Sequence, residues 1–187
     1  MSNPIFSDFF ECCVGQWISE RTYHYIAQSF VERSRTEFTV SRLTPEKKTK
    51  VLQDNGYPTI NDTGDLQGFN LGFYTISEAG EEVTQNLNIL FVVKETSEQH
   101  LFGDYLRDRA YEEARPIVST FKFDLATREL LMSTPYTRVV SVDSITLVNP
   151  NVRVRRILNY VKPAPGQPLK DLGLVGFGVE QKQASSA

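Results

Sequence analysis

Apolar and polar positions alternate with a period of two along most of the chain, which is typical of β-strands that bury one face. Between Trp17 and Gln28, the residues Trp17, Arg21 and Tyr23 fall on one face and His24 falls on the other. Strand character recurs in Val31–Leu43, Leu66–Ser77, Val83–Lys94, Pro116–Phe123, Glu129–Ser133, Val139–Val148, Val152–Val161 and Leu174–Gln181. The pattern therefore predicts about nine short strands.

Three segments depart from this period. The apolar residues of segment 4–14 recur at roughly helical spacing, which predicts an N-terminal helix: they are Ile5, Phe6, Phe9, Phe10 and Cys13. The charged stretch Pro45–Asn55 predicts a helical turn or short helix that ends at Gly56. Residues 96–113 have no clean strand period, and we expect a helical turn within Gln99–Glu112.

The connections between the predicted strands indicate how the chain is organised. Glu78–Glu81 is a hairpin turn in which Gly80 can take a positive φ. Residues 162–171 carry three prolines and predict a rigid loop before the last strand, and residues 182–187 predict a frayed tail. The length of 187 residues fits a single domain spanning residues 1–187.

Many short strands without helical crossovers favour an antiparallel sandwich or barrel. The N-terminal helix would plug one end of a barrel, and closure would remove the exposed sheet edges. Gly15-Gln16-Trp17 resembles the GxW signature of lipocalin-like barrels, in which the Trp packs across the closed end. We therefore predict a mainly antiparallel all-β fold, and a barrel in preference to a sandwich.

Composition narrows the functional classes. The 20 Lys+Arg and 23 Asp+Glu residues give a formal net charge of −3, which argues against a generic nucleic-acid binder. A hydrophobic share of 40%, with 12 Phe and 8 Tyr, is enough to fill a core. No apolar run predicts a membrane span, and the N-terminal residues lack the pattern of a secretory signal.

The cysteine and histidine content indicates a reducing, cytosolic setting. The only cysteines, Cys12 and Cys13, are adjacent and offer no disulfide framework. With only two histidines and no CxxC or HExxH motif, we expect no metal site. The sequence also lacks GxSxG, P-loop and GxGxxG signatures, so no standard hydrolase or nucleotide site is predicted.

Two arginines are the clearest candidates for ligand binding. Arg153 and Arg155 lie two residues apart in a predicted strand, so their side chains project from the same face. If that face is internal, the pair would form a clamp for carboxylates and would need anionic partners. If it is external, the two side chains are simply solvated.

The candidate catalytic residues are Glu180, His24 and Arg21. Glu180 in an aromatic pocket would accept hydrogen bonds from ligand N–H groups, or donate a proton with a raised pKa. His24 would be a proton donor or a ligand contact, although a histidine in a strand is more often structural. Arg21 is alternatively a solvated side chain, and Glu180 a surface residue near the end of the chain.

Phe69 and Phe73 share one strand face and are candidates for lining an apolar ligand site, with ordinary core packing as the alternative. Cys12 and Cys13 have no His–Asp pair near them in the sequence, so we do not expect a catalytic thiol.

Three segments, in order along the chain, resemble one family. Gly15–His24 (GQWISERTYH) is similar to an opening G-x-W-x-S-x-R-T-x-H, and Tyr105–Glu112 (YLRDRAYE) to a central L-R-D-x-G-Y-x-E. Asn149–Arg155 (NPNVRVR) resembles a P-N-L-R-x-R strand. These are motifs of the S/U-type phycobiliprotein lyases, the chromophore lyase family that includes CpcS and CpeS. Phe69 stands where that family often has Trp.

The resemblance implies a ten-stranded barrel like those of lipocalins and fatty-acid-binding proteins. It also implies binding of an open-chain tetrapyrrole (bilin), phycocyanobilin or phycoerythrobilin, as substrate rather than as a tightly bound cofactor. Arg153 and Arg155 would hold the propionates, and Glu180 would face the pyrrole nitrogens.

The implied partners are the bilin and an apo-subunit of phycocyanin, allophycocyanin or phycoerythrin, whose cysteine would receive the bilin. The lyase would work alone, as a homodimer or with a paralogue, in the cyanobacterial cytosol or the chloroplast stroma. Two alternatives remain open at this point: a carrier that binds a bilin or a fatty-acid-like ligand without transferring it, and a chaperone for phycobiliprotein assembly.

Overall fold

The computed structural model describes residues 3–58, 60, 62–108 and 117–184. The helices are α1 (Pro4–Cys13) and α2 (Pro45–Asp54). The strands are β1 (Gly15–Tyr25), β2 (Phe30–Arg42), β3 (Gln67–Ser77), β4 (Glu82–Thr96), β5 (His100–Arg107), β6 (Ile117–Asp124), β7 (Glu129–Pro135), β8 (Val139–Asn149), β9 (Val152–Val161) and β10 (Leu172–Lys182).

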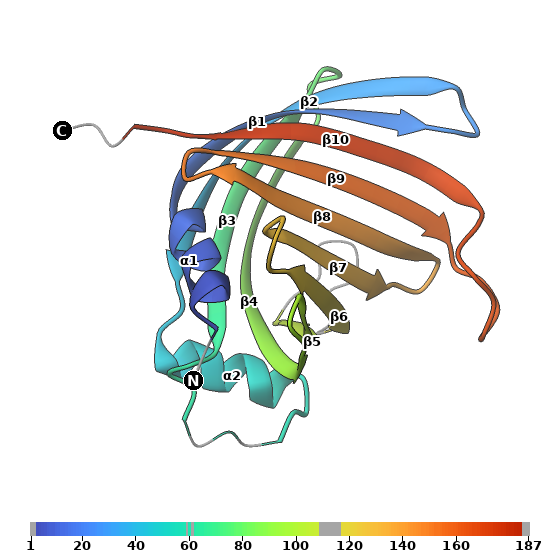
Figure 1. The fold of residues 1–187 in the computed structure, drawn as a ribbon. Coiled ribbons are helices and arrows are strands. Elements are labelled where there is room, and N and C mark those ends of the chain that lie inside the picture. The colour runs from blue at the N-terminus through green and yellow to red at the C-terminus, as the bar shows by residue number, and fades with distance from the viewer. Residues whose placement is uncertain (1–2, 59, 61, 109–116, 185–187) are drawn as a thin grey trace.

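These strands form one closed antiparallel barrel (Figure 1). Each strand pairs with its neighbours in the sequence, and β1 closes the barrel by pairing with β10, with Trp17 opposite Lys182 and Tyr25 opposite Leu174. Because closure pairs the first strand with the last, the sheet has no free edge. The predicted all-β barrel of about ten strands with an N-terminal helix is confirmed.

Helix α1 closes one end of the barrel interior. Asn3 caps the helix by accepting hydrogen bonds from the backbone N–H groups of Ile5 and Phe6. The helix buries four apolar side chains in the barrel core: Phe6, Phe9, Phe10 and Cys13. At its end, the indole N–H of Trp17 donates to the carbonyl of Cys13 at 2.8 Å, which ties the helix to β1.

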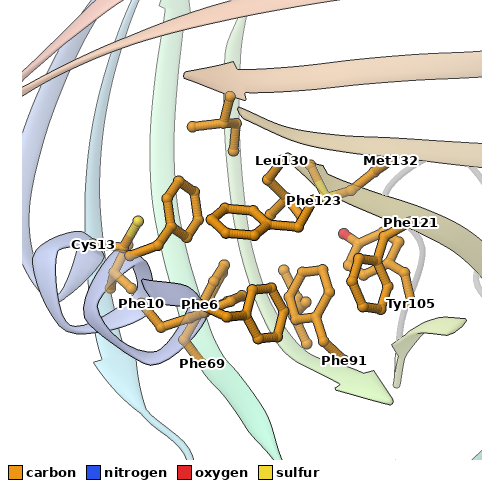
Figure 2. Close-up of a cluster of buried hydrophobic side chains, with 14 of the residues drawn as sticks. Phe6, Phe10, Cys13, Phe69, Phe91, Tyr105, Phe121, Phe123, Leu130 and Met132 are labelled. Atoms are coloured by element: carbon orange, nitrogen blue, oxygen red, sulfur yellow. The ribbon is translucent and has the colours of Figure 1, made fainter. Parts of the chain in front are cut away.

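Aromatic rings from β3, β4 and β6 pack against this helix (Figure 2). The ring of Phe6 stacks on that of Phe121 with centroids 5.6 Å apart, and the ring of Phe10 lies 5.0 Å from that of Phe91. Packing of this kind contributes both burial and specific ring geometry. The aromatic residues predicted in the N-terminal helix therefore form the plug of the barrel.

Helix α2 covers the outer face of β4 and β5. Val51 and Leu52 of the helix pack against apolar residues that point outward from these strands: Leu90, Val92 and Leu106. The helix ends as predicted, with Gly56 at a φ of 62°.

The predicted helical turn within Gln99–Glu112 is wrong for residues 100–107, which form β5. The inward-facing Leu101 and the outward-facing Leu106 are both buried, because the core covers one face of β5 and α2 covers the other. A strand buried on both faces has no alternating pattern, so its sequence does not show a period of two. The remainder of that segment, residues 109–112, lies outside the described residues.

The other connections follow the prediction closely. Gly80 takes a φ of 84° in the turn between β3 and β4. The predicted frayed tail is wrong at its first residue: Lys182 belongs to β10, and its ammonium group donates to the carbonyl of Cys12 at 2.7 Å. Residues 185–187 of that tail lie outside the described residues.

Within the described part of the chain, neither helix is long or apolar enough to cross a lipid bilayer.

We expect Phe6→Ala to lower the free energy of unfolding by about 3–5 kcal/mol, because it leaves a cavity between α1 and the barrel wall. Phe6 is 1% exposed, whereas Ile5 on the same helix is 41% exposed. Ile5→Ala is therefore the matched control and should change stability by less than about 0.5 kcal/mol. Urea unfolding of both variants measures the difference, and equal effects would contradict the role of α1 as the plug.

Candidate functional site

The strand register brings four of the residues singled out in the sequence to the interior of the barrel. Glu180 on β10 lies opposite Arg153 on β9, and Arg155 and Arg21 both lie opposite Gly178. Arg153 and Arg155 therefore face inward together, so the solvated outer face considered for them is wrong. The anionic partners that this orientation requires are carboxylates of the protein itself.

The carboxylate of Glu180 is the centre of this group. Its Oε1 accepts a hydrogen bond from Nη2 of Arg21 at 3.0 Å, and its Oε2 accepts one from Nε of Arg153. Glu180 is fully buried and Arg153 is 3% exposed. The carboxylate thus joins β1, β9 and β10 through two charge-assisted hydrogen bonds.

Arg153 is held on its other side by aromatic rings. Its guanidinium carbon lies 4.5 Å from the ring centroid of Trp17 and 5.1 Å from that of Phe38. The face of an aromatic ring attracts a cation, most strongly once both groups are desolvated. The GxW tryptophan therefore does more than fill the core: it supports the arginine that anchors Glu180.

The charges around Glu180 keep it ionised. Burial by itself would raise the pKa of the Glu180 carboxyl, but the positive charges of three nearby arginines, led by Arg153, lower it to about 2. The structure thus differs from the raised pKa that a proton-donor role would require. The two settings considered for Glu180 from the sequence were an aromatic pocket and the surface, whereas its immediate surroundings are buried and cationic.

Arg155 has a different environment from Arg153. Its Nη2 donates to Oδ2 of Asp143 on β8 at 3.2 Å, and the charge of Asp143 raises the pKa of Arg155 although burial opposes it. Nε of Arg155 and Oδ1 of Asp143 are both buried without a hydrogen-bond partner. The two side chains remain 20% and 24% exposed, so solvent reaches this part of the interior. The pair therefore combines partial exposure of its side chains with hydrogen-bonding atoms that the protein leaves without a partner.

Sequence reasoning missed Asp143. Its signal was present, since Asp143 is the only charged residue of the predicted strand Val139–Val148. The alternation of that strand places Asp143 on the same face as Ile145 and Leu147, both of which are buried. An acid on the buried face of a strand indicates a partner of opposite charge.

The two phenylalanines lie in different surroundings. Phe69 is 8% exposed, and its ring packs against those of Phe10 and Phe91 in the plugged end. Phe69 therefore corresponds to the alternative of ordinary core packing, because α1 occupies the interior that Phe69 faces (Figure 2). Phe73 is only partly buried at the edge of this core.

His24 does not join the group. It lies on the outer face of β1 opposite Val31 of β2, and it is exposed. The structure therefore gives no support to His24 as a proton donor or contact for a ligand inside the barrel.

The structure also gives no support to a cysteine of this chain as a nucleophile. Burial raises the pKa of the thiol of Cys13, the last residue of α1, which is 1% exposed. Cys12 is partly exposed, and the cysteines of the described residues form no disulfide. A buried thiol with a raised pKa is protonated at neutral pH and is a poor nucleophile.

The lowered pKa of Glu180 predicts a loss of stability in acid. An unfolded-state pKa of 4.5 and a folded-state pKa of about 2 mean that the ionised carboxylate contributes stability above pH 4.5. That stability is lost as the pH falls towards 2. We expect this one group to lower the free energy of unfolding by about 2 kcal/mol between pH 5 and pH 3.

Denaturant unfolding of wild type and of Glu180→Gln/Arg153→Met at both pH values isolates this contribution. The double variant also replaces Arg153, because Glu180→Gln alone would leave this fully buried arginine without an anion, whereas Arg21 is partly exposed. Glu37→Gln, on the outer face of β2, should retain the full pH dependence. An identical pH dependence in wild type and the double variant would contradict the assignment.

Comparisons with known proteins agree with the resemblance. A family model described as CpeS-like protein matches residues 6–183. The chain is 59% identical over 177 residues to "Chromophore lyase CpcS/CpeS 1" of Synechococcus sp. (strain JA-3-3Ab), covering 95% of this chain and 96% of that protein. It is 28% identical over 150 residues to "Chromophore lyase CpcS/CpeS 2" of Trichodesmium erythraeum (strain IMS101), covering 79% and 75% of the two chains.

A solved structure shares the fold. The S-type phycobiliprotein lyase CPES from Guillardia theta superposes with a TM-score of 0.75 at 17% sequence identity. The match covers 100% of this chain and 95% of that one.

Proposed function

The chain belongs to the CpeS-like family, and from this premise we propose that it is a chromophore lyase that attaches a bilin to a cysteine of an apo-phycobiliprotein subunit. The observation that carries the proposal is the inward-facing Arg155–Asp143 pair, whose side chains are 20% and 24% exposed and retain a donor and an acceptor without a hydrogen-bond partner. These are the groups that a ligand with carboxylates and pyrrole N–H groups would bind.

Different walls of the barrel would make different kinds of contact with the bilin. A bilin is a large conjugated ligand with two propionates, so it needs both apolar contact and cationic partners. Phe73 and Leu71 lie partly buried at the edge of the aromatic core and would contact the conjugated rings. Arg155 would bind one propionate through a charge-assisted hydrogen bond.

Carboxylates would face the pyrrole nitrogens. Oδ1 of Asp143, whose other oxygen is bonded to Arg155, has no hydrogen-bond partner. Glu180 is bonded to Arg21 and Arg153. Since both oxygens of Glu180 already accept hydrogen bonds, we assign Glu180, Arg21 and Arg153 to positioning and to the electrostatics of the site. An ionised carboxylate near the pyrroles favours their protonated form, which makes the bilin more electrophilic.

In the proposed reaction, the thiolate of the acceptor subunit adds to the ethylidene group of ring A. A C–S bond forms, the double bond is consumed, and a proton is taken up at the neighbouring carbon, with no leaving group. The lyase contributes an extended, oriented bilin and protection from competing additions. The reaction needs no nucleophile from the lyase, in agreement with the buried Cys13. It would take place where phycobiliproteins are assembled, in the cytosol of a cyanobacterium.

The test combines purified protein, phycocyanobilin and an apo-phycocyanin subunit. A denaturation-resistant, zinc-fluorescent adduct on the subunit is the expected result. Bound but untransferred bilin would replace the lyase proposal with a carrier, and no bilin binding would leave an assembly chaperone.

We expect Arg155→Gln to weaken phycocyanobilin binding about ten-fold or more, because it removes a charge-assisted hydrogen bond to a propionate. Arg156→Gln is the matched control on the same strand, since its side chain is 52% exposed on the outer face of the barrel. Absorbance titration measures both affinities. Equal affinity of Arg155→Gln and wild type would rule out the assigned contact.

We expect the double variant Cys12→Ser/Cys13→Ala to retain transfer to the subunit. The acceptor supplies the thiol, and neither cysteine is placed as a nucleophile. Transfer is measured as the initial rate of adduct formation, with unfolding in urea as the control for the core position Cys13. Loss of transfer in a stably folded double variant would show that the lyase uses a thiol of its own.

A further inference from the structure

Arg107 at the end of β5 is an interior arginine that the site described above does not use. It lies opposite Ile89 of β4 and Ile117 of β6, and it is 6% exposed. Two tyrosines hold its guanidinium group: the carbon Cζ lies 5.3 Å from the ring centroid of Tyr105 and 5.4 Å from that of Tyr136.

The polar contacts of Arg107 are incomplete. Its Nη2 donates to the hydroxyl oxygen of Tyr136 at 3.0 Å, while its Nε is buried without a hydrogen-bond partner. Among the described residues, the other interior arginines each have a carboxylate: Arg21 and Arg153 pair with Glu180, and Arg155 pairs with Asp143. Arg107 forms no ion pair within that part of the chain, and a buried cation without an anion is costly.

The balance of charges inside the barrel also indicates a cation without an anionic partner. The described strands place four arginines inside the barrel, against the two carboxylates Asp143 and Glu180: Arg21, Arg107, Arg153 and Arg155. The surplus is 4 − 2 = 2 positive charges.

Three further charged residues lie at inward register positions at the rims of the barrel. Glu32 accepts a hydrogen bond from Tyr25, Lys182 donates one to the carbonyl of Cys12, and Arg42 forms an ion pair with Glu11 of α1. The charges of Glu32 and Lys182 are opposite, and so are those of Arg42 and Glu11, so these residues leave the balance unchanged. A ligand with two carboxylates would neutralise the surplus.

We propose that Arg107 receives one carboxylate of the bound bilin while Arg155 receives the other, so that the two propionates are held from different walls of the barrel. This inference rests on the proposed bilin substrate and extends it. It replaces the pairing of Arg153 with Arg155 as the propionate clamp, because Arg153 is already bonded to Glu180 and stacked on Trp17.

The positions of the two arginines suit this division. Three strands (β8, β7 and β6) separate β9, which carries Arg155, from β5, which carries Arg107. The negative charge of Asp143 acts on both guanidinium groups, and Tyr105 beside Arg107 interacts with Arg155. Both arginines therefore interact with the same interior acid, and we expect two propionates of one tetrapyrrole to bind on either side of it.

The test compares phycocyanobilin with its dimethyl ester, which keeps the conjugated system and removes both charges. Absorbance titration gives the affinity of wild type, Arg107→Met and Arg107→Lys for each. Wild type should prefer the diacid. Arg107→Met should bind the diacid about ten- to a hundred-fold more weakly and bind the ester as wild type does.

Arg107→Lys should recover part of the preference, because it restores the charge without the planar fork. Arg156→Met on the outer face is the control and should keep the wild-type preference. Urea unfolding of the ligand-free proteins checks that Arg107→Met is folded.

The other outcomes overturn the inference in distinguishable ways. If wild type binds the diacid and Arg107→Met retains the full preference for it over the ester, Arg107 binds no carboxylate. If Arg107→Met weakens the binding of diacid and ester equally, Arg107 is only structural. If wild type binds neither compound, the proposed function itself fails.

Discussion

The arrangement of this protein depends on one buried carboxylate. Glu180 accepts hydrogen bonds from Arg21 and Arg153, and so connects the first strand of the barrel to the last two. Without it, Arg153 on β9 would be a buried cation without an anion, next to the strand that closes the barrel with β1. Without the arginines, the carboxylate could not remain ionised at such depth. The closure of the barrel and the charge of its interior are therefore fixed by the same contact.

This contact also separates the interior into two regions. On one side, α1 and its phenylalanines fill the barrel interior with packed aromatic rings, which stabilises the fold. On the other side, inward-facing groups such as Arg155 and Asp143 keep partial exposure and unused hydrogen-bonding atoms. The first region stabilises the fold, and the second is where we propose that the bilin binds.

Much of this could be predicted from the chain alone, because periodicity and turn residues are local properties. The alternation in β1 identified the face that carries Trp17 and Arg21, and the spacing of Arg153 and Arg155 placed them on one face. β5 was missed because burial on both faces removes the alternation. Asp143 was missed because one acid in a strand does not identify its partner in the sequence. Only the strand register shows that it lies beside Arg155.

The sequence by itself determined the fold class, the plugging helix and the family, since hydrophobic period, glycine positions and motif order do not require knowledge of contacts. Only the tertiary structure decided which charges pair. Strands distant in the sequence bring Glu180 to Arg153 and leave Arg107 without a carboxylate among the described residues. Charges in a low-dielectric interior are weakly screened, so the energy of each depends strongly on the charges around it, and strand order and register together set those neighbours.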